Sequence, residues 1–476
     1  MNHAQDAPAK LRPKDWMNRR GLSAVVALLA LFCGQAPIRA YTLRYRDGSG
    51  IVARRWLARP IIVAFSSSLS SPPSNIKPGS DVIGAARRAL ERWASVADIQ
   101  FLETRSSAQT TSPPNAGDRI NLITVSAENA ALFGPSENPG RTRVFSDSGG
   151  AIVEADIALN PHELFSSDGT PGTYDLESTF THEVGHLLGL EHSAVIGATM
   201  QPRQAQNGVY GLPAFTQRTL SEDDMAGARS LYGSRSGTGS VSGRLISNAS
   251  PGHAQPIFGG HVFAEDALTG RVVAGSVTLS SGEYRLDALA PGNYRLIGQS
   301  LDGPIGTVDI APAGGPYASL AETTPSFRSI IIAGQSSSEL TTVTANVAAS
   351  LGFFRSANPP PTLKPQVIGM NGELSTTALP LEAGKTFTIY VGGEGLDQIL
   401  ASGISISSPF ISVDPATLME EEFDTPYPVF SFEVTVAPNT PPGEYSIRLQ
   451  TSSGELAYLP GALTIDPEIL PSGKTF

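Results

Sequence analysis

The segment THEVGHLLGLEHS, residues 181–193, constrains this chain more than any other, because it places three of the seven histidines in an otherwise apolar stretch. His182 and His186 are four residues apart, so on a helix they project from one face, one turn above the other. Two neutral imidazoles at that spacing can bind one zinc ion. Glu183 follows His182, and its carboxylate can reach a water on that ion without itself being a ligand.

A glycine and a third histidine extend this pattern to H-E-x-x-H-x-x-G-x-x-H. Gly189 can adopt a positive φ and turn the chain out of the helix, which would bring His192 to the same ion. A core helix with ordinary hydrogen-bonded histidines is the alternative, and it is favoured by the apolar neighbours Val184, Leu187, Leu188 and Leu190. We prefer the metal site, because three buried histidines without a shared partner would carry a desolvation penalty.

The N-terminal segment has the pattern of an export signal. Arg19 and Arg20 precede an apolar stretch, Gly21–Cys33, that is too short to span a bilayer as a stable helix. Small residues at plausible cleavage positions follow, and we prefer cleavage after Ala40. A signal peptide over residues 1–40 predicts a protein that is secreted to the exterior or to the periplasm.

Composition sets further limits on function. The 476 residues carry a formal net charge of −11, which argues against nucleic acid or anionic membrane as the main partner, because such surfaces require an excess of Lys and Arg. The only cysteine, Cys33, lies in the expected signal, so the mature chain would have no disulfide. A lipid anchor on that cysteine and export through a twin-arginine route are the alternatives. No other apolar run is long enough to span a membrane.

Residues 41–233 combine strand-like and helical patterns, which predicts a mixed α/β region. The last helix has a capping signature, because Ser221 can cap it, Asp224 can close a capping box and Gly233 can end it. Strands are expected at 60–65, 98–101, 119–125 and 151–160, and helices are expected from residues 80–81, from Leu176 and within 220–233.

The rest of the chain predicts all-β structure in two units. A flexible linker at 234–240 precedes short alternating runs over 241–350, with turn residues every ten or so positions, as in an antiparallel β-sandwich. A Pro-rich linker at 351–365 leads to a second unit of this kind at 366–467.

The histidine motif resembles that of the metzincin clan of zinc proteases, and the residues around it resemble the matrixins. Ser193 follows the third histidine, and Met200, in ATMQP, lies where the family has its Met-turn. LSEDDMAGARSLYG resembles the family's final helix, and DLEST and ARRWLARPIIVAF also fit, so the resemblance covers about residues 53–233. The two β units resemble carboxypeptidase-regulatory-like (prealbumin-like) and immunoglobulin-like sandwiches.

The resemblance implies a multidomain zinc endopeptidase with an α/β (α+β) metzincin-type domain. In that domain His182, His186 and His192 would bind one catalytic Zn²⁺. Glu183 would be the general base that takes a proton from water and then delivers it to the leaving amine.

The same resemblance assigns structural roles and a substrate. Gly189 would make the turn at the site, and Met200 would form its floor. The strand at 151–160 is a candidate edge for an extended protein or peptide substrate, and residues 201–215 would wall the pocket past the scissile bond.

Two features depart from the animal matrixins. Their latency uses a propeptide cysteine on the zinc, which the mature chain would lack. Many also bind a structural zinc through upstream histidines, but His162 is the only histidine between residue 40 and the motif, so we expect one zinc and a surface position for His162. Structural calcium is a further option, although aspartates in Gly-rich turns are more often solvated; the candidates are Asp147, Asp156, Asp168 and Asp175.

Two other classes of function remain open. One is an inactive or narrowly specific surface or adhesion protein on a protease scaffold, against which the intact Glu183 argues; the other is a zinc hydrolase of non-peptide bonds. The β units could act as spacers, as substrate-docking modules or as modules for surface or matrix adhesion. We interpret His253 and His261, in the first unit, as structural residues.

Overall fold

Strands form at or near the predicted segments in all parts of the described chain, but the strand expected at 98–101 begins only at Phe101 and runs to Ser106. The computed structural model describes residues 42–45, 53–134, 138–233, 236–247, 255–310, 315–323, 326–332, 340–356 and 360–466. These residues belong to one compact unit, Arg39–Phe476. The expected signal peptide at 1–40, with Cys33, and also His253 lie outside the described residues, so both interpretations stay predictions.

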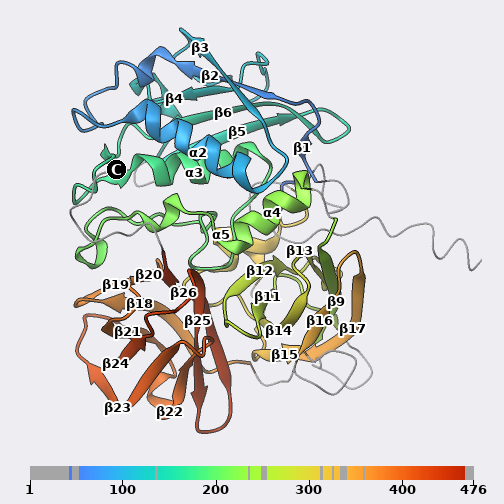
Figure 1. Cartoon of the computed structure of the whole chain (residues 1–476), viewed down its shortest axis with the longest axis vertical. Coiled ribbons are helices and arrows are strands. Elements are labelled where there is room, and N and C mark those ends of the chain that lie inside the picture. The colour runs from blue at the N-terminus through green and yellow to red at the C-terminus, as the bar shows by residue number, and fades with distance from the viewer. Residues whose placement is uncertain are drawn as a thin grey trace, which may run out of the picture. The chain divides into compact units, whose positions relative to one another are not determined.

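A six-stranded sheet organises residues 42–233, which we call the N-terminal region (Figure 1). The strand order is β1-β6-β4-β2-β3, and β5 pairs antiparallel with β6 while the other pairs are parallel. The strands are β1 (Arg55–Trp56), β2 (Ile61–Ser66), β3 (Phe101–Ser106), β4 (Leu122–Thr124), β5 (Gly140–Ser146) and β6 (Ala151–Leu159).

Strand β5 corrects one expectation about the sheet. It pairs with β6 from Ile152 to Leu159, so β6 is an inner strand and the expectation that residues 151–160 form the edge was wrong. The segment GRTRVFS was not recognised as a strand, because polar side chains interrupt its apolar positions. Among the described strands, β5 pairs with β6 alone and is therefore an edge.

Helices α2 (Val82–Val96) and α3 (Leu176–Leu187) lie side by side (Figure 1). The α2 helix forms where apolar residues recur at helical spacing, and Asp81 caps it by accepting from Gly84 N at 2.9 Å. Trp93, fully buried on α2, donates from Nε1 to Thr181 O on α3 at 2.8 Å. This contact fixes α3 between α2 and strands β5 and β6.

Helix α3 is the core helix of the N-terminal region, because all of its residues are buried. Asp175 caps it by accepting from Ser178 N at 2.9 Å. Helix α4 (Glu222–Tyr232) begins with the predicted capping box, in which Ser221 and Asp224 hydrogen-bond to each other's main chain, and it ends at Gly233. The helices predicted from residues 80–81, from Leu176 and within 220–233 are thus confirmed. Each of them begins next to a residue whose side chain caps it.

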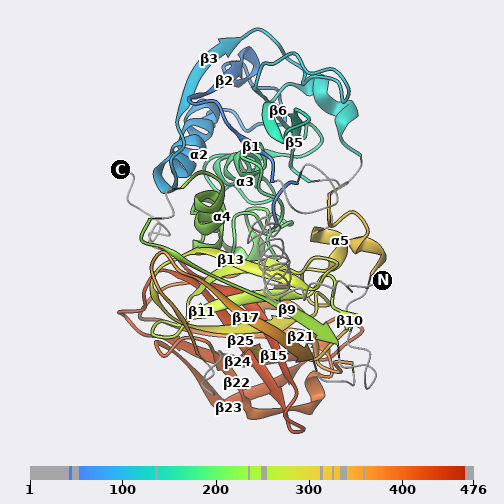
Figure 2. The same cartoon turned by 90° about the vertical axis from the view of Figure 1, so that its right-hand side faces the viewer.

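Two sheets form the first β region, residues 239–356. Strands β9 and β17 lie side by side in one of them (Figure 2). This sheet contains β9 (Gly239–Ser247), β10 (Gln255–Pro256), β13 (Glu283–Leu289) and β17 (Ala348–Ser356). The other contains β11 (His261–Asp266), β12 (Val272–Val277), β14 (Gly292–Gln299), β15 (Ile330–Ile332) and β16 (Thr341–Val343). A short helix, α5 (Thr307–Ile310), follows β14.

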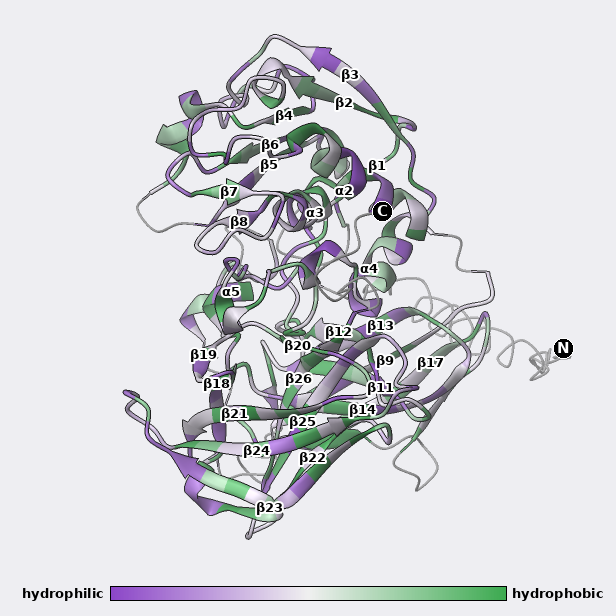
Figure 3. Cartoon of the chain, turned by 60° about the vertical axis from the view of Figure 1, so that its left-hand side comes forward, coloured by the Kyte–Doolittle hydropathy of each residue, from purple (hydrophilic) through white to green (hydrophobic). Residues whose placement is uncertain are grey.

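The second β region, residues 364–465, also has two sheets, and apolar and polar residues alternate along its strands (Figure 3). One sheet contains β18 (Lys364–Met370), β19 (Glu373–Ser375), β21 (Thr386–Glu394), β23 (Ile411–Glu421) and β24 (Val429–Val436). The other contains β20 (Leu379–Leu381), β22 (Ile399–Ile406), β25 (Gly443–Thr451) and β26 (Leu456–Ile465).

The strands extend into both segments that the sequence analysis assigned to linkers. Within 234–240, β9 begins at Gly239, and within 351–365, β17 continues to Ser356 and β18 begins at Lys364. Among the described helices, none has the length and apolar content that crossing a membrane requires.

One buried apolar cluster is shared by all three regions. Val195 and Ala198 come from the N-terminal region, immediately after the histidine motif, and Tyr458 comes from β26. The remaining members come from the first β region: Phe263, Val272 and Ile297. The segment that follows His192 is therefore packed against both β regions.

Candidate metal centre

Helix α3 and the turn after it bring three histidines together. The ring centroids of His182 and His186, on successive turns of α3, are 4.8 Å apart, and that of His192 lies 5.5 and 5.0 Å from them. One nitrogen from each ring lies within 4.8 Å of the other two. Within the described ranges, these histidines form the one group of three or more potential ligand side chains that could hold a metal ion.

Gly189 turns the chain so that His192 returns toward the helix. Its φ is +97°, and a Cβ at this position would lie 2.4 Å from Arg54 O, so both the conformation and the close approach require glycine. Arg44 braces the turn, because its main-chain N donates to Gly189 O at 2.9 Å and its side chain pairs with Glu191 at 2.5 Å.

A hydrogen bond from Nδ1 to a main-chain carbonyl fixes each histidine ring. Since a carbonyl can only accept, Nδ1 carries the proton in each ring and Nε2 keeps its lone pair. Burial lowers the pKa of all three rings, which keeps them neutral. The pairs are His182–Thr199 O (2.8 Å), His186–Leu190 O (2.9 Å) and His192–Asp309 O (2.7 Å). Three neutral imidazoles with carbonyl partners fit the ligand set that zinc prefers.

Glu183 is buried beside the histidines and is oriented from strand β5. Thr142 Oγ1 donates to Glu183 Oε2 at 2.6 Å and lies 3.0 Å from Glu183 O. A Cβ at Gly140 would lie 2.6 Å from Glu183 Oε1, so the glycine leaves the space that the carboxylate occupies. Burial raises the pKa of Glu183 to about 7.

Met200 packs directly against the helix between the first two histidines. A Cβ at Gly185 would lie 2.2 Å from Met200 Sδ and 2.9 Å from Trp93 Cζ2, so a larger residue there would displace the Met200 side chain. Asp224, which closes the capping box of α4, accepts from Met200 N at 3.0 Å and from Thr199 N at 2.7 Å. Helix α4 therefore holds the segment whose Thr199 carbonyl fixes His182.

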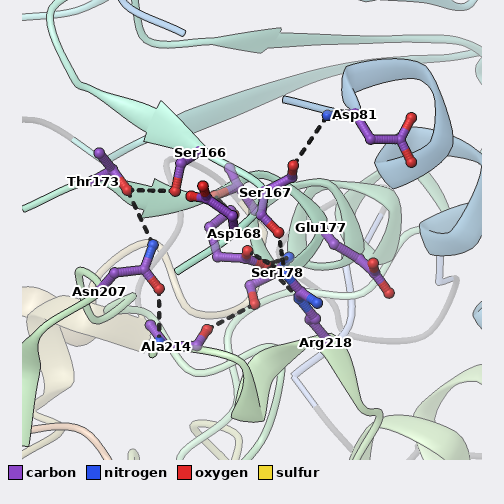
Figure 4. A network of polar contacts seen from close by, with 12 residues as sticks. Asp81, Ser166, Ser167, Asp168, Thr173, Glu177, Ser178, Asn207, Ala214 and Arg218 are labelled. Carbon is purple, nitrogen blue, oxygen red and sulfur yellow. Dashed lines mark hydrogen bonds and ion pairs between the residues drawn. The ribbon is translucent and has the colours of Figure 1, made fainter. Parts of the chain in front are cut away.

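Residues 201–215, the expected wall of the substrate pocket, are tied to the start of α3 (Figure 4). Asn207 Nδ2 donates to Thr173 Oγ1 at 3.1 Å, and Asn207 Oδ1 accepts from Ala214 N at 2.8 Å. Ser178, in the first turn of α3, donates from Oγ to Ala214 O at 3.0 Å. Asn207 thus folds this segment back against the helix that carries the histidines.

Within the described ranges, none of the four aspartates considered for calcium belongs to a group of three or more potential metal ligands. Burial raises the pKa of Asp156 to about 6, whereas the hydrogen bond from Lys77 lowers the pKa of Asp168 to about 2. Each aspartate has protein partners: Asp147 with Gly149 N and Ala151 N, Asp156 with Ser112 N and Leu122 N, Asp168 with Lys77 Nζ, and Asp175 with Arg218 Nη2.

The two remaining described histidines are in different surroundings. His162 is exposed, as expected, and its main-chain N donates to Asn160 Oδ1 at 3.0 Å. His261 is fully buried on β11, and neither ring nitrogen has a hydrogen-bond partner. Burial lowers the pKa of His261 to about 3, so it is a neutral core residue.

The sequence analysis did not identify three residues that contact the site. Gly140 and Thr142 lie on the unrecognised strand β5, and a glycine before an alternating strand was the only available signal. Asp309 lies more than a hundred residues after His192, and its contribution is a main-chain carbonyl, which no side-chain motif reveals.

Comparison with known proteins places this geometry in context. The family model Matrixin (Peptidase M10) matches residues 65–233. Metalloendoproteinase 1 of Glycine max is 30% identical over 162 residues, which cover 31% of this chain and 45% of that protein. Stromelysin-1 of Rattus norvegicus is 32% identical over 157 residues, or 33% of this chain and 29% of that protein. The chain thus spans less than half the length of these curated relatives.

Solved structures also align with about half of the chain, at low scores. The major pilin subunit BcpA of Bacillus cereus covers 46% of this chain and 66% of its own, with 12% identity and a TM-score of 0.16. Dpr2 Ig1-Ig2, from a complex with DIP-Theta Ig1-Ig3, covers 47% of this chain and 95% of its own, with 12% identity and a TM-score of 0.15. Scores this low set no constraint on fold or function.

Proposed function

Residues 65–233 belong to the matrixin family of peptidases, and from this membership we propose that the chain is a secreted or periplasmic zinc-dependent endopeptidase that acts on proteins. One observation carries the proposal: all three histidine rings are fixed through Nδ1, and a buried carboxylate, Glu183, lies beside them. A histidine cluster with only a structural role would not need one nitrogen of each ring to lie within 4.8 Å of the other two.

In this proposal His182, His186 and His192 hold one zinc ion. Bound there, zinc supplies Lewis-acid polarisation of the peptide carbonyl and lowers the pKa of water. Glu183 moves the proton: a carboxylate oxygen accepts it from the attacking water and later donates it to the leaving amine nitrogen. Thr142 holds the other carboxylate oxygen, so the side chain keeps one orientation during both transfers.

Further residues shape the site without taking part in proton transfer. We assign Gly189 to the turn that returns His192, and Met200 to the floor on which α3 rests. Steric contacts support these roles. A Cβ at residue 189 would collide with Arg54 O, and a Cβ at Gly185 would collide with the Met200 thioether.

An extended peptide is the substrate form that the sheet suits best. Strand β5 is an edge and carries Thr142, which contacts Glu183. A substrate strand that pairs with β5 would therefore run past the carboxylate. Residues 201–215 lie next to α3 and would wall the pocket for the side chain that follows the scissile bond.

The proposed organisation has four parts. Residues 1–40 form the signal peptide, 41–233 the catalytic domain, 239–356 the first β-sandwich domain and 364–465 the second. Export of the chain would depend on the signal peptide. The first and last strands of each β region support the bounds of the two β-sandwich domains.

Removal of the metal tests this function. We expect the purified chain to contain one zinc ion and to cleave an unfolded protein. A chelator should abolish cleavage, and added zinc should restore it, because the three histidines alone provide no Lewis acid. Cleavage that persists in zinc-free protein would contradict the proposal.

A further inference from the structure

The third histidine of the site is held by the first β region. His192 Nδ1 donates to Asp309 O, in α5, at 2.7 Å, whereas the acceptors for the other two rings, Leu190 O and Thr199 O, lie within the N-terminal region. The orientation of one of three ring nitrogens is therefore set from outside the N-terminal region.

The carboxylate of Asp309 fixes the position of that carbonyl. Arg203 Nη2 donates to both carboxylate oxygens, at 2.8 and 3.0 Å, and Gly306 N donates to Oδ2 at 2.8 Å. Arg203 also donates from Nη1 to Pro304 O, at the start of the same segment. The Asp309 side chain is 15% exposed and that of Arg203 is 43% exposed, so the acceptor side of this pair is the more buried one.

Contacts on the other side of the motif connect the same two regions. Ser193, next to His192, donates from Oγ to Asp223 Oδ2 at 2.6 Å, and Asp223 Oδ1 accepts from Gly275 N, on β12, at 2.6 Å. Val195, two residues further, packs in the apolar cluster with Phe263 of β11. His192 thus lies between two attachments to the first β region, one through Asp309 O and the other through Gly275 and the apolar cluster.

We propose that Asp309 is a positioning residue of the metal centre, and that the first β region completes the zinc site. The carbonyl of Asp309 holds the His192 ring, and its carboxylate, through Arg203, holds the carbonyl in place. The inference rests on the proposed function, since it requires that His192 is a zinc ligand. It gives the first β region a role in the active site, in place of a spacer or a docking module.

The test is the zinc dissociation constant of the full chain, measured by competition with a chelator. Asp309→Ala removes both carboxylate contacts, so we expect zinc binding about 10-fold weaker, as for loss of other groups that orient a ligand. Asp309→Asn keeps an acceptor for Gly306 N and should fall between wild type and Asp309→Ala. Arg203→Ala should weaken zinc binding in the same direction.

A matched control separates positioning from general stability. Glu283→Ala breaks an ion pair with Arg244 between strands β13 and β9 of the first β region, and its zinc dissociation constant should equal that of wild type. At saturating zinc, Asp309→Ala should lower kcat more than it raises KM, because the ring is misplaced and substrate contacts are retained.

The outcomes distinguish the two proposals. Folded Asp309→Ala with the zinc affinity and kcat of wild type would overturn the positioning role and leave the proposed function intact. A wild-type chain that binds no zinc would overturn both. If Asp309→Ala does not fold, Asp309→Asn decides the matter by the same two measurements.

Discussion

At the scale of residues, main-chain atoms decide what the histidine motif can do. Spacing alone places His182 and His186 on one face of a helix, but the carbonyls of Thr199, Leu190 and Asp309 fix which nitrogen of each ring is free. The side-chain motif was therefore predictable from the sequence. The acceptors were not, because any residue supplies a carbonyl.

Gly140 provides a test of how Glu183 is oriented. A Cβ there would lie 2.6 Å from Glu183 Oε1, so Gly140→Ala should displace the carboxylate and lower kcat/KM about 10-fold or more, with the zinc content unchanged. Gly292→Ala is the control, since its Cβ would meet Tyr294 at an ordinary 3.5 Å. Wild-type kinetics in Gly140→Ala would show that the carboxylate is not held at this position.

From the burial of His261 we expect the free energy of unfolding to depend on pH. Burial lowers its pKa from 6.5 to about 3, so between these values the unfolded chain binds a proton that the folded chain excludes. The contribution of His261 is therefore complete above pH 6.5 and is lost as the pH falls, by about 1.4 kcal/mol per unit. Thermal unfolding at pH 7 and pH 5 should show a larger loss for wild type than for His261→Leu.

Asp223 must be considered in that comparison, because it accepts from Gly275 N and a Cβ at Gly275 would lie 2.8 Å from His261 Nε2. Burial raises the pKa of Asp223 to about 7, so its protonation favours the folded state as the pH falls, opposite in sign to His261. This contribution is present in wild type and in His261→Leu, and it cancels in the difference between them. Equal pH dependence in the two proteins would show that the ring is not buried.

At the scale of elements, the helices were predictable and the edge strand was not. The starts of α2, α3 and α4 carry local capping residues, Asp81, Asp175 and Ser221, which act within one turn. Strand β5 is stabilised by pairing with β6. Its sequence lacks the regular alternation of apolar and polar residues that identifies a strand. Sheet order is a long-range property, so the edge was assigned to the wrong strand.

The wall segment 201–215 depends on the second β region in a testable way. Tyr210 has a φ of 59°, which is strained for a tyrosine, and its N donates to Glu373 Oε2 at 2.8 Å. Glu373→Ala removes this acceptor, so we expect faster amide hydrogen exchange across 201–215 and unchanged exchange in α3. Glu382→Ala, which breaks an exposed pair with Lys385, is the control. Unchanged exchange in Glu373→Ala would show that the Glu373 carboxylate does not hold the segment in place.

At the scale of the whole molecule, the β regions could be foreseen but their attachment could not. Alternating runs predicted sandwiches, and the segments at 234–240 and 351–365 were predicted as linkers between the parts. Instead Val195, Phe263 and Tyr458 share one buried cluster. The apolar character of such residues predicts that their side chains are buried. The sequence does not show which other region of the chain they pack against.

The measurement that bears most directly on the proposed enzyme is cleavage of an unfolded protein by the full chain, wild type beside Glu183→Gln, with zinc assayed in both. We predict that Glu183→Gln keeps one zinc ion per chain and loses about 100-fold or more of the cleavage rate, because the amide cannot accept the proton. Glu128→Gln, on the surface, should match wild type. Cleavage by Glu183→Gln at the wild-type rate would contradict the proposed mechanism.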